Sequence, residues 1–90
     1  MSGSLGAIQK NFSLRILTAT NKNSTDKSIF IVAIPPDLAG KINAMICAVT
    51  GAWGSLGVIN SYLNGNNINI KTNISAGEYN TSFLILFLLK

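Results

Sequence analysis

Histidine is absent from this sequence of 90 residues, and only three side chains are carboxylic acids, Asp26, Asp37 and Glu78. Without histidine, the chain lacks the commonest general base and a common metal ligand of proteins. Each carboxylate has a simple structural interpretation, as part of a polar loop, as a helix cap and as part of a turn. We therefore expect no catalytic residues, no metal site and no cofactor, and the sequence predicts that the protein is not an enzyme.

Cysteine occurs once, at Cys47, which excludes a disulfide within the chain. The neighbours of Cys47 are apolar, which favours an inert buried thiol over a nucleophile. The first ten residues show neither the basic region nor the long apolar segment of a signal peptide. The sequence thus predicts synthesis in the cytoplasm without a signal peptide, and leaves open a later place in a virion or another assembly.

Charge is also scarce, because charged residues make up 11% of the chain, against about 25% in typical globular proteins. The polar surface must be built from asparagine, serine and threonine, which number eleven, nine and six. The net charge of +4 comes from scattered basic residues, whereas nucleic-acid binders concentrate positive charge on one face. Weak charge repulsion favours association. We therefore expect the partners to be copies of the same chain, with another structural protein as a further candidate, and not nucleic acid.

Four segments have the patterns of β-strands. Residues 12–19 place Phe12, Leu14 and Ile16 on one face and polar residues on the other, the pattern of a half-buried strand. Residues 28–34 are short, β-branched and nearly all apolar, and residues 68–74 alternate between isoleucine and polar residues after an Asn64-Gly65 turn signal. Residues 81–90 include seven consecutive apolar residues, which predicts a central strand covered on both faces.

Between these two pairs of strands, the sequence predicts one helix that begins near Leu38, with Asp37 as its N-cap. Bulky apolar residues follow at helical spacing: Leu38, Ile42, Met45, Ile46 and Val49. The helix is expected to end near Gly51 or to continue as far as Leu63. The predicted fold is α+β, a small single domain over residues 1–90 with the order β-β-α-β-β. It has an antiparallel sheet, one central apolar helix, and residues 1–11 as a flexible N-terminal arm.

The face of this helix opposite the bulky stripe is lined by small residues, which let another backbone approach closely. We predict a self-association interface made of these residues and a nearby tryptophan: Gly40, Ala44, Cys47, Ala48, Gly51, Trp53 and Ser55. Three covers for this face remain open, namely the rest of the same chain, a neighbouring copy, or a membrane. Residues 42–65 carry no charge and are long enough for one membrane crossing, but their four glycines and the flanking strands disfavour it.

These features together predict a non-enzymatic structural subunit that acts through homo-oligomeric self-assembly, such as a small virion, tail or filament component. A small adaptor or inhibitor that binds one heterologous protein is the alternative, because it needs the same exposed apolar patch. A protein with a single membrane span is the third interpretation. The sequence does not separate a second copy from a heterologous partner.

Overall fold

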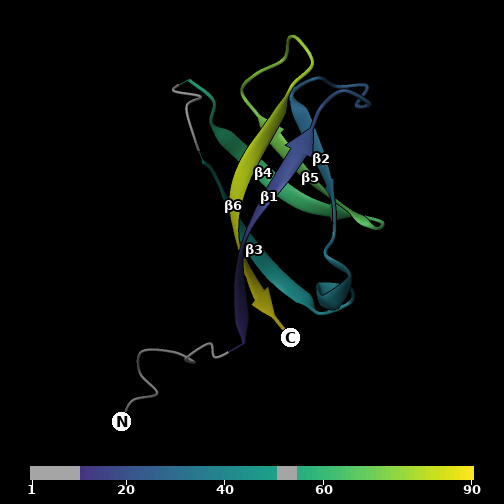
Figure 1. The fold of residues 1–90 in the computed structure, drawn as a ribbon, viewed down its shortest axis with the longest axis vertical. Helices are drawn as coiled ribbons and strands as arrows, with labels where there is room; N and C mark the ends of the chain where they lie inside the picture. The colour runs from purple at the N-terminus through teal and green to yellow at the C-terminus, as the bar shows by residue number, and fades with distance from the viewer. Residues whose placement is uncertain (1–10, 51–54) are drawn as a thin grey trace.

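The structure is a computed structural model that describes residues 11–50 and 55–90. Six strands make up nearly all of the regular structure: β1 (Phe12–Thr20), β2 (Ile29–Ala33), β3 (Ile42–Val49), β4 (Val58–Asn64), β5 (Asn67–Thr72) and β6 (Asn80–Leu89). They form one antiparallel sheet in the order β3-β6-β1-β2-β5-β4. Figure 1 shows the long strands β1 and β6 side by side, with β4 and β5 crossing behind them. The sheet curls into a nearly closed, barrel-like shape.

The predicted α+β fold with a central apolar helix is wrong, because residues 42–49 form strand β3. This strand pairs with β6 from Ile42, opposite Leu89, to Val49, opposite Phe83. All side chains of β3 except that of Asn43 are apolar. No polar residue therefore distinguishes a repeat of two from a repeat of 3.6, and the apolar strand β6 beside it decides in favour of pairing.

The helical content among the described residues is one short 3-10 turn, η2 (Pro36–Leu38). Asp37 lies within this turn, and the N-cap position is occupied by Pro35 without a side-chain hydrogen bond, so the predicted cap is also wrong. The carboxylate of Asp37 instead accepts two hydrogen bonds from the guanidinium group of Arg15 in β1. Asp37 therefore ties the turn to the sheet, which places Leu38 against the core.

The four predicted strands are confirmed as β1, β2, β5 and β6. The turn signal at Asn64-Gly65 is also confirmed, because Gly65 has a φ of 60° between β4 and β5. Strand β4 was not predicted. Its pairing with β5 shifts between Val58 and Asn60, and such a bulge interrupts the alternation by which a strand is recognised in sequence.

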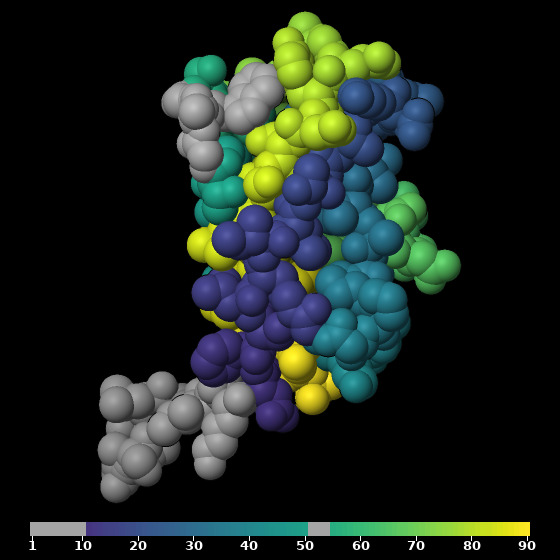
Figure 2. Space-filling model, viewed as in Figure 1, coloured from purple at the N-terminus to yellow at the C-terminus, as the bar shows by residue number. Residues whose placement is uncertain are grey.

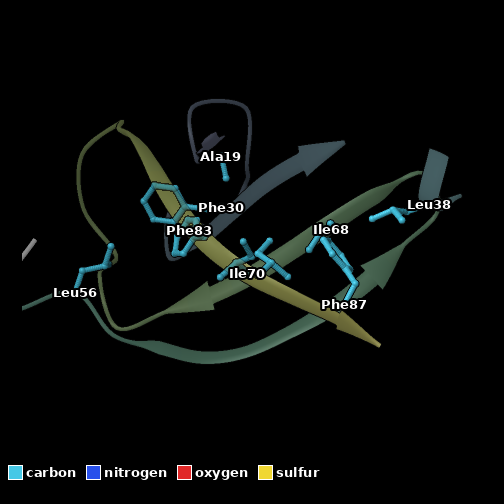
Figure 3. Packing of buried hydrophobic residues seen from close by; sticks show 9 residues of the cluster. Ala19, Phe30, Leu38, Leu56, Ile68, Ile70, Phe83 and Phe87 are labelled. Carbon is cyan, nitrogen blue, oxygen red and sulfur yellow. The ribbon is translucent and has the colours of Figure 1, made fainter. Parts of the chain in front are cut away.

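The core lies inside the curved sheet and is built mainly from the inward side chains of β6, β5 and β2. Phe83, Ile85 and Phe87 of β6 are fully buried, together with Ile68 and Ile70 of β5. Phe30 of β2 packs edge-on against Phe83, with ring centroids 5.7 Å apart. Figure 3 shows these side chains between the strands, with Leu38 and Leu56 at opposite ends. Each such burial stabilises the fold by about 1.5 to 3 kcal/mol.

One end of the sheet is held by Asn21, which is fully buried in the loop after β1. Its Nδ2 donates hydrogen bonds to the carbonyl oxygens of Lys27, at 2.7 Å, and Gly77, at 3.4 Å. Its Oδ1 accepts a hydrogen bond of 2.6 Å from the backbone N–H of Tyr79. A single amide group thus joins the β1–β2 loop to the turn before β6. Removing it would leave buried backbone groups without partners.

Gly77 in this turn should be sensitive to substitution. Its φ is +80°, a conformation that costs a residue with a Cβ about 1 to 2 kcal/mol. An added Cβ would also lie 2.5 Å from Cε2 of Tyr79, so the ring would have to move. We expect Gly77→Ala to lower the free energy of unfolding by about 1 to 3 kcal/mol in urea titrations. Gly57→Ala is the control, because nothing lies within 4 Å of its added Cβ. Equal unfolding midpoints for the two variants would contradict this role of Gly77.

Candidate functional site

Strands β3, β6 and β1 lie next to one another, and their outward side chains form a continuous surface that we call the apolar outer face. Directly opposed residues of neighbouring strands share a face of a sheet. The pairing therefore arranges nine apolar side chains in three rows: Phe12, Leu88 and Ala44; Leu14, Leu86 and Ile46; Ile16, Leu84 and Ala48. None of them carries a charge or a hydrogen-bonding group.

The margins of this face are exposed to solvent. Phe12, Leu14, Ile16 and Ile46 are 58%, 60%, 65% and 69% exposed, and the three leucines of β6 between them are partly buried. Since a large apolar side chain presents about 150 Å² when fully exposed, the face has an apolar area of about 500 to 600 Å². The largest apolar patch on a typical monomer is about 300 to 600 Å² and often functional. In Figure 2 the purple surface of β1 runs across the middle of the molecule beside the yellow of β6.

The orientation of β1 is the reverse of the half-buried strand that its sequence predicts. Phe12, Leu14 and Ile16 point outward, whereas Ser13 and Arg15 lie opposite the buried Phe87 and Ile85 of β6. Arg15 reaches the interior edge because its side chain has two partners there: Nε donates to Ser13 Oγ at 2.9 Å, and the guanidinium group pairs with Asp37. The arginine side chain is thus held in a solvent-exposed ion pair, and the apolar side of β1 is left outside.

The outer surface over β5 and β4 is largely polar, whereas β2 contributes the partly buried Ile29 and Ile31 to the same side. Asn60 lies beside Lys71 there, Tyr62 beside Asn69, and Asn64 beside Asn67. Oδ1 of Asn69 is buried and accepts no hydrogen bond from the described residues. The outer surface of the sheet therefore has an apolar half and a polar half, and only the apolar half combines large area with the absence of polar groups.

The predicted interface residues do not lie on one face. Ala44 and Ala48 are both on the apolar outer face, on either side of Ile46, whereas Cys47 points inward opposite Ile85. Gly40, with a φ of 75°, lies in the turn before β3, and the carbonyl oxygen of Ser55 accepts a hydrogen bond of 2.7 Å from Asn73 Nδ2. Gly51 and Trp53 lie outside the described residues, as do residues 1–10 of the predicted arm.

Sequence reasoning missed most of the apolar outer face: Phe12, Leu14, Ile16, Ile46, Leu84, Leu86 and Leu88. The available signal was the apolar run of β6, which is apolar at odd and at even positions. Such a strand needs a cover on each side. The described residues supply the inner cover alone.

Cys47 is the one free thiol, and it lies half-buried on the inner side of β3. Burial disfavours the thiolate and raises the pKa of Cys47 to about 11. The thiol therefore remains protonated at neutral pH, as expected for an inert cysteine.

A polar network lies at the start of β2, away from the apolar outer face. Asp26 Oδ1 accepts hydrogen bonds from the N–H of Ser28, at 2.9 Å, and from its hydroxyl, at 2.6 Å. Lys71 Nζ lies 3.0 Å from Asp26 Oδ2 and also donates to Ser28 Oγ. The Asp26 carboxylate thus accepts hydrogen bonds from Ser28 and pairs with the ammonium group of Lys71. It therefore joins the β1–β2 loop to β5.

Within residues 11–50 and 55–90 the structure contains no pocket and no group of three metal-ligating side chains. In the same ranges no helix has the length and apolar character to cross a membrane. The chain matches no protein-family model, and no curated protein or solved structure is significantly similar to it.

The network around Asp26 should make the free energy of unfolding depend on pH in the acidic range. Hydrogen bonds from Ser28 and then Lys71 lower the pKa of Asp26 from 3.8 to about 2. A carboxylate whose pKa is lower in the folded chain than in the unfolded chain stabilises the fold at pH values above its unfolded pKa. This contribution disappears as the pH falls toward its folded pKa. We expect the free energy of unfolding to fall between about pH 4 and pH 2, and to fall less in Asp26→Asn.

Urea unfolding at a series of pH values measures this effect. Glu78→Gln is the control, because it removes the ion pair with Lys27 and leaves Asp26 and its partners in place. An Asp26→Asn variant that keeps the acid dependence of the original protein would contradict the assignment.

Proposed function

We propose that this chain is a structural subunit that functions by self-association, and that the apolar outer face is its contact surface. The observation that carries the proposal is the exposure of that face: four large apolar side chains at its margins are 58–69% exposed. Three neighbouring strands contribute to it in matched rows, so it is a contiguous surface and not a set of isolated residues.

The area of the face is sufficient for a specific contact. Two such faces in contact would bury about 1,000 Å² or slightly more, and specific interfaces begin at about 1,000 Å². Area alone does not set the affinity of such a contact, because the loss of free motion and the ordering of side chains on binding oppose it. The area supports the proposal only by being large enough for a contact of this kind.

The charges of the chain also support self-association. In the part of the chain that the structure describes, the ion pairs Arg15–Asp37, Lys27–Glu78 and Lys71–Asp26 join different segments and involve no residue of the apolar outer face. None of the nine side chains of the face is charged, so the face itself brings no charge into a contact between two copies, where burial of an unpaired charge would be strongly unfavourable.

A lysine at the exposed margin of the face should abolish self-association. Ile46 is 69% exposed, so Ile46→Lys leaves the core intact in a single copy but places a charge in the contact. We expect light scattering or sedimentation at micromolar concentration to show an assembly for the original protein and a monomer for Ile46→Lys. The far-ultraviolet circular dichroism of the two should be the same.

Ile59→Lys is the matched control. Ile59 is 66% exposed and also belongs to an outermost strand of the sheet, but it is not part of the apolar outer face. This variant should assemble like the original protein. A strictly monomeric original protein would refute self-association and favour an adaptor that binds one heterologous protein. Normal assembly of Ile46→Lys would refute the assignment of the face.

A further inference from the structure

The two margins of the apolar outer face differ in bulk. On the β1 side, all three rows end in a large side chain, Phe12, Leu14 or Ile16. On the β3 side, the outer rows end in alanine, at Ala44 and Ala48, and only the middle row ends in a large side chain, that of Ile46. A bulky column thus lies on one side of β6 and a shorter column on the other.

We infer that the same face of a second copy covers the apolar outer face, related by a two-fold axis parallel to β6. This inference rests on the proposed function and adds the arrangement of the two copies. Rotation by 180° about such an axis exchanges the two margins, so β1 of each copy packs over β3 of the other. The rows remain matched: Phe12 over the partner's Ala44, Leu14 over the partner's Ile46, and Ile16 over the partner's Ala48.

A second copy fits the face for a reason of symmetry. A head-to-tail contact needs two different complementary surfaces, whereas a two-fold contact needs one surface that complements itself. Outside the face, the large apolar side chains exposed within residues 11–50 and 55–90 are those of Ile59, Tyr62, Leu63 and Tyr79, and the first three belong to β4, at the other end of the strand order from β3. One large apolar surface therefore favours a closed pair.

The direction of the axis follows from packing density. An axis across the strands would place β1 over the partner's β1, with Phe12 against the partner's Ile16 and Leu14 against the partner's Leu14. It would also place Ala44 against the partner's Ala48. One margin would be overpacked and the other would contain a void, and both defects are unfavourable. The axis along β6 sets large side chains against small ones in the two outer rows.

Cross-linking of single cysteines tests this arrangement in the full chain. Each variant carries Cys47→Ser, so that the introduced cysteine is the only thiol. A short bifunctional maleimide, with a spacer matched to the separation of about 10 Å between packed sheets, links thiols that face each other. Leu86 lies on the inferred axis, so Leu86→Cys should yield a covalent dimer as the main product.

The margins distinguish the two possible axes. Leu14→Cys mixed with Ile46→Cys, one of them with a mass tag, should give the mixed dimer, and each variant alone should give several-fold less dimer. Ile59→Cys is the control for random collisions and should cross-link no better in buffer than in urea. Light scattering on each variant confirms that it still associates.

The outcomes separate this inference from the proposed function. Efficient cross-linking of Ile46→Cys alone, without the mixed dimer, would overturn the axis along β6 while self-association stands. Assembly without a cross-link at Leu86→Cys would overturn the face-to-face pair and point to contact through strand edges. A monomer in every measurement would refute the proposed function itself, with the face covered by another protein or by other residues of the chain.

Discussion

Strand β6 is apolar on both of its faces, and the rest of the structure depends on this property. Phe83, Ile85 and Phe87 point into the core, while Leu84, Leu86 and Leu88 point away from it. Alternate residues of a strand always face opposite sides, so no rotation of β6 can bury both sets within a single curved sheet. The fold buries the set that contains the two phenylalanines. The three leucines consequently make the outer surface of β6 apolar.

The two neighbours of β6 extend this outer surface instead of covering it. The polar side of β1 could have faced outward, but Arg15 and Ser13 are directed inward, where the guanidinium group pairs with Asp37 at 3.1 Å between Nη1 and Oδ1. Strand β3 contributes Ala44, Ile46 and Ala48 to the outside. The Arg15–Asp37 ion pair and the apolar outer face are thus two consequences of the same orientation of β1.

The sequence was sufficient to predict most strands, but not the element that completes the face. Residues of β1 and β5 alternate, β2 is rich in β-branched residues, and β6 contains a continuous apolar run, and all three patterns depend on local sequence alone. Residues 42–49 are apolar at nearly every position, so their structure depends on pairing with β6, which is distant in sequence. The orientation of β1 also depends on its register against β6, and no local pattern reports it.

Two of the predicted interface residues, Ala44 and Ala48, do lie together on the apolar outer face, and their spacing explains why. Residues four apart lie on the same side of both a helix and a strand, because four is close to one helical turn and is also an even number. Ala44 and Ala48 therefore share a face in either structure. Residues three apart separate in a strand, and Cys47 accordingly points inward, away from Ala44. The spacing of four therefore predicted correctly that Ala44 and Ala48 share a face, although the predicted helix is a strand.

Under the proposed self-association, a face-to-face contact alone limits the size of the assembly. A face that complements itself closes a pair of copies and is then fully used, so a filament or lattice requires a second kind of contact. Strands β3 and β4 are the outermost strands in the pairing order, and neither contains a charged residue or a proline, the features with which proteins usually protect sheet edges. The bulge after Val58 distorts the pairing of β4, whereas β3 is regular from Ala44 to Val49. In the nearly closed sheet, however, β3 and β4 also lie close to each other, so the two edges partly cover one another within a single chain.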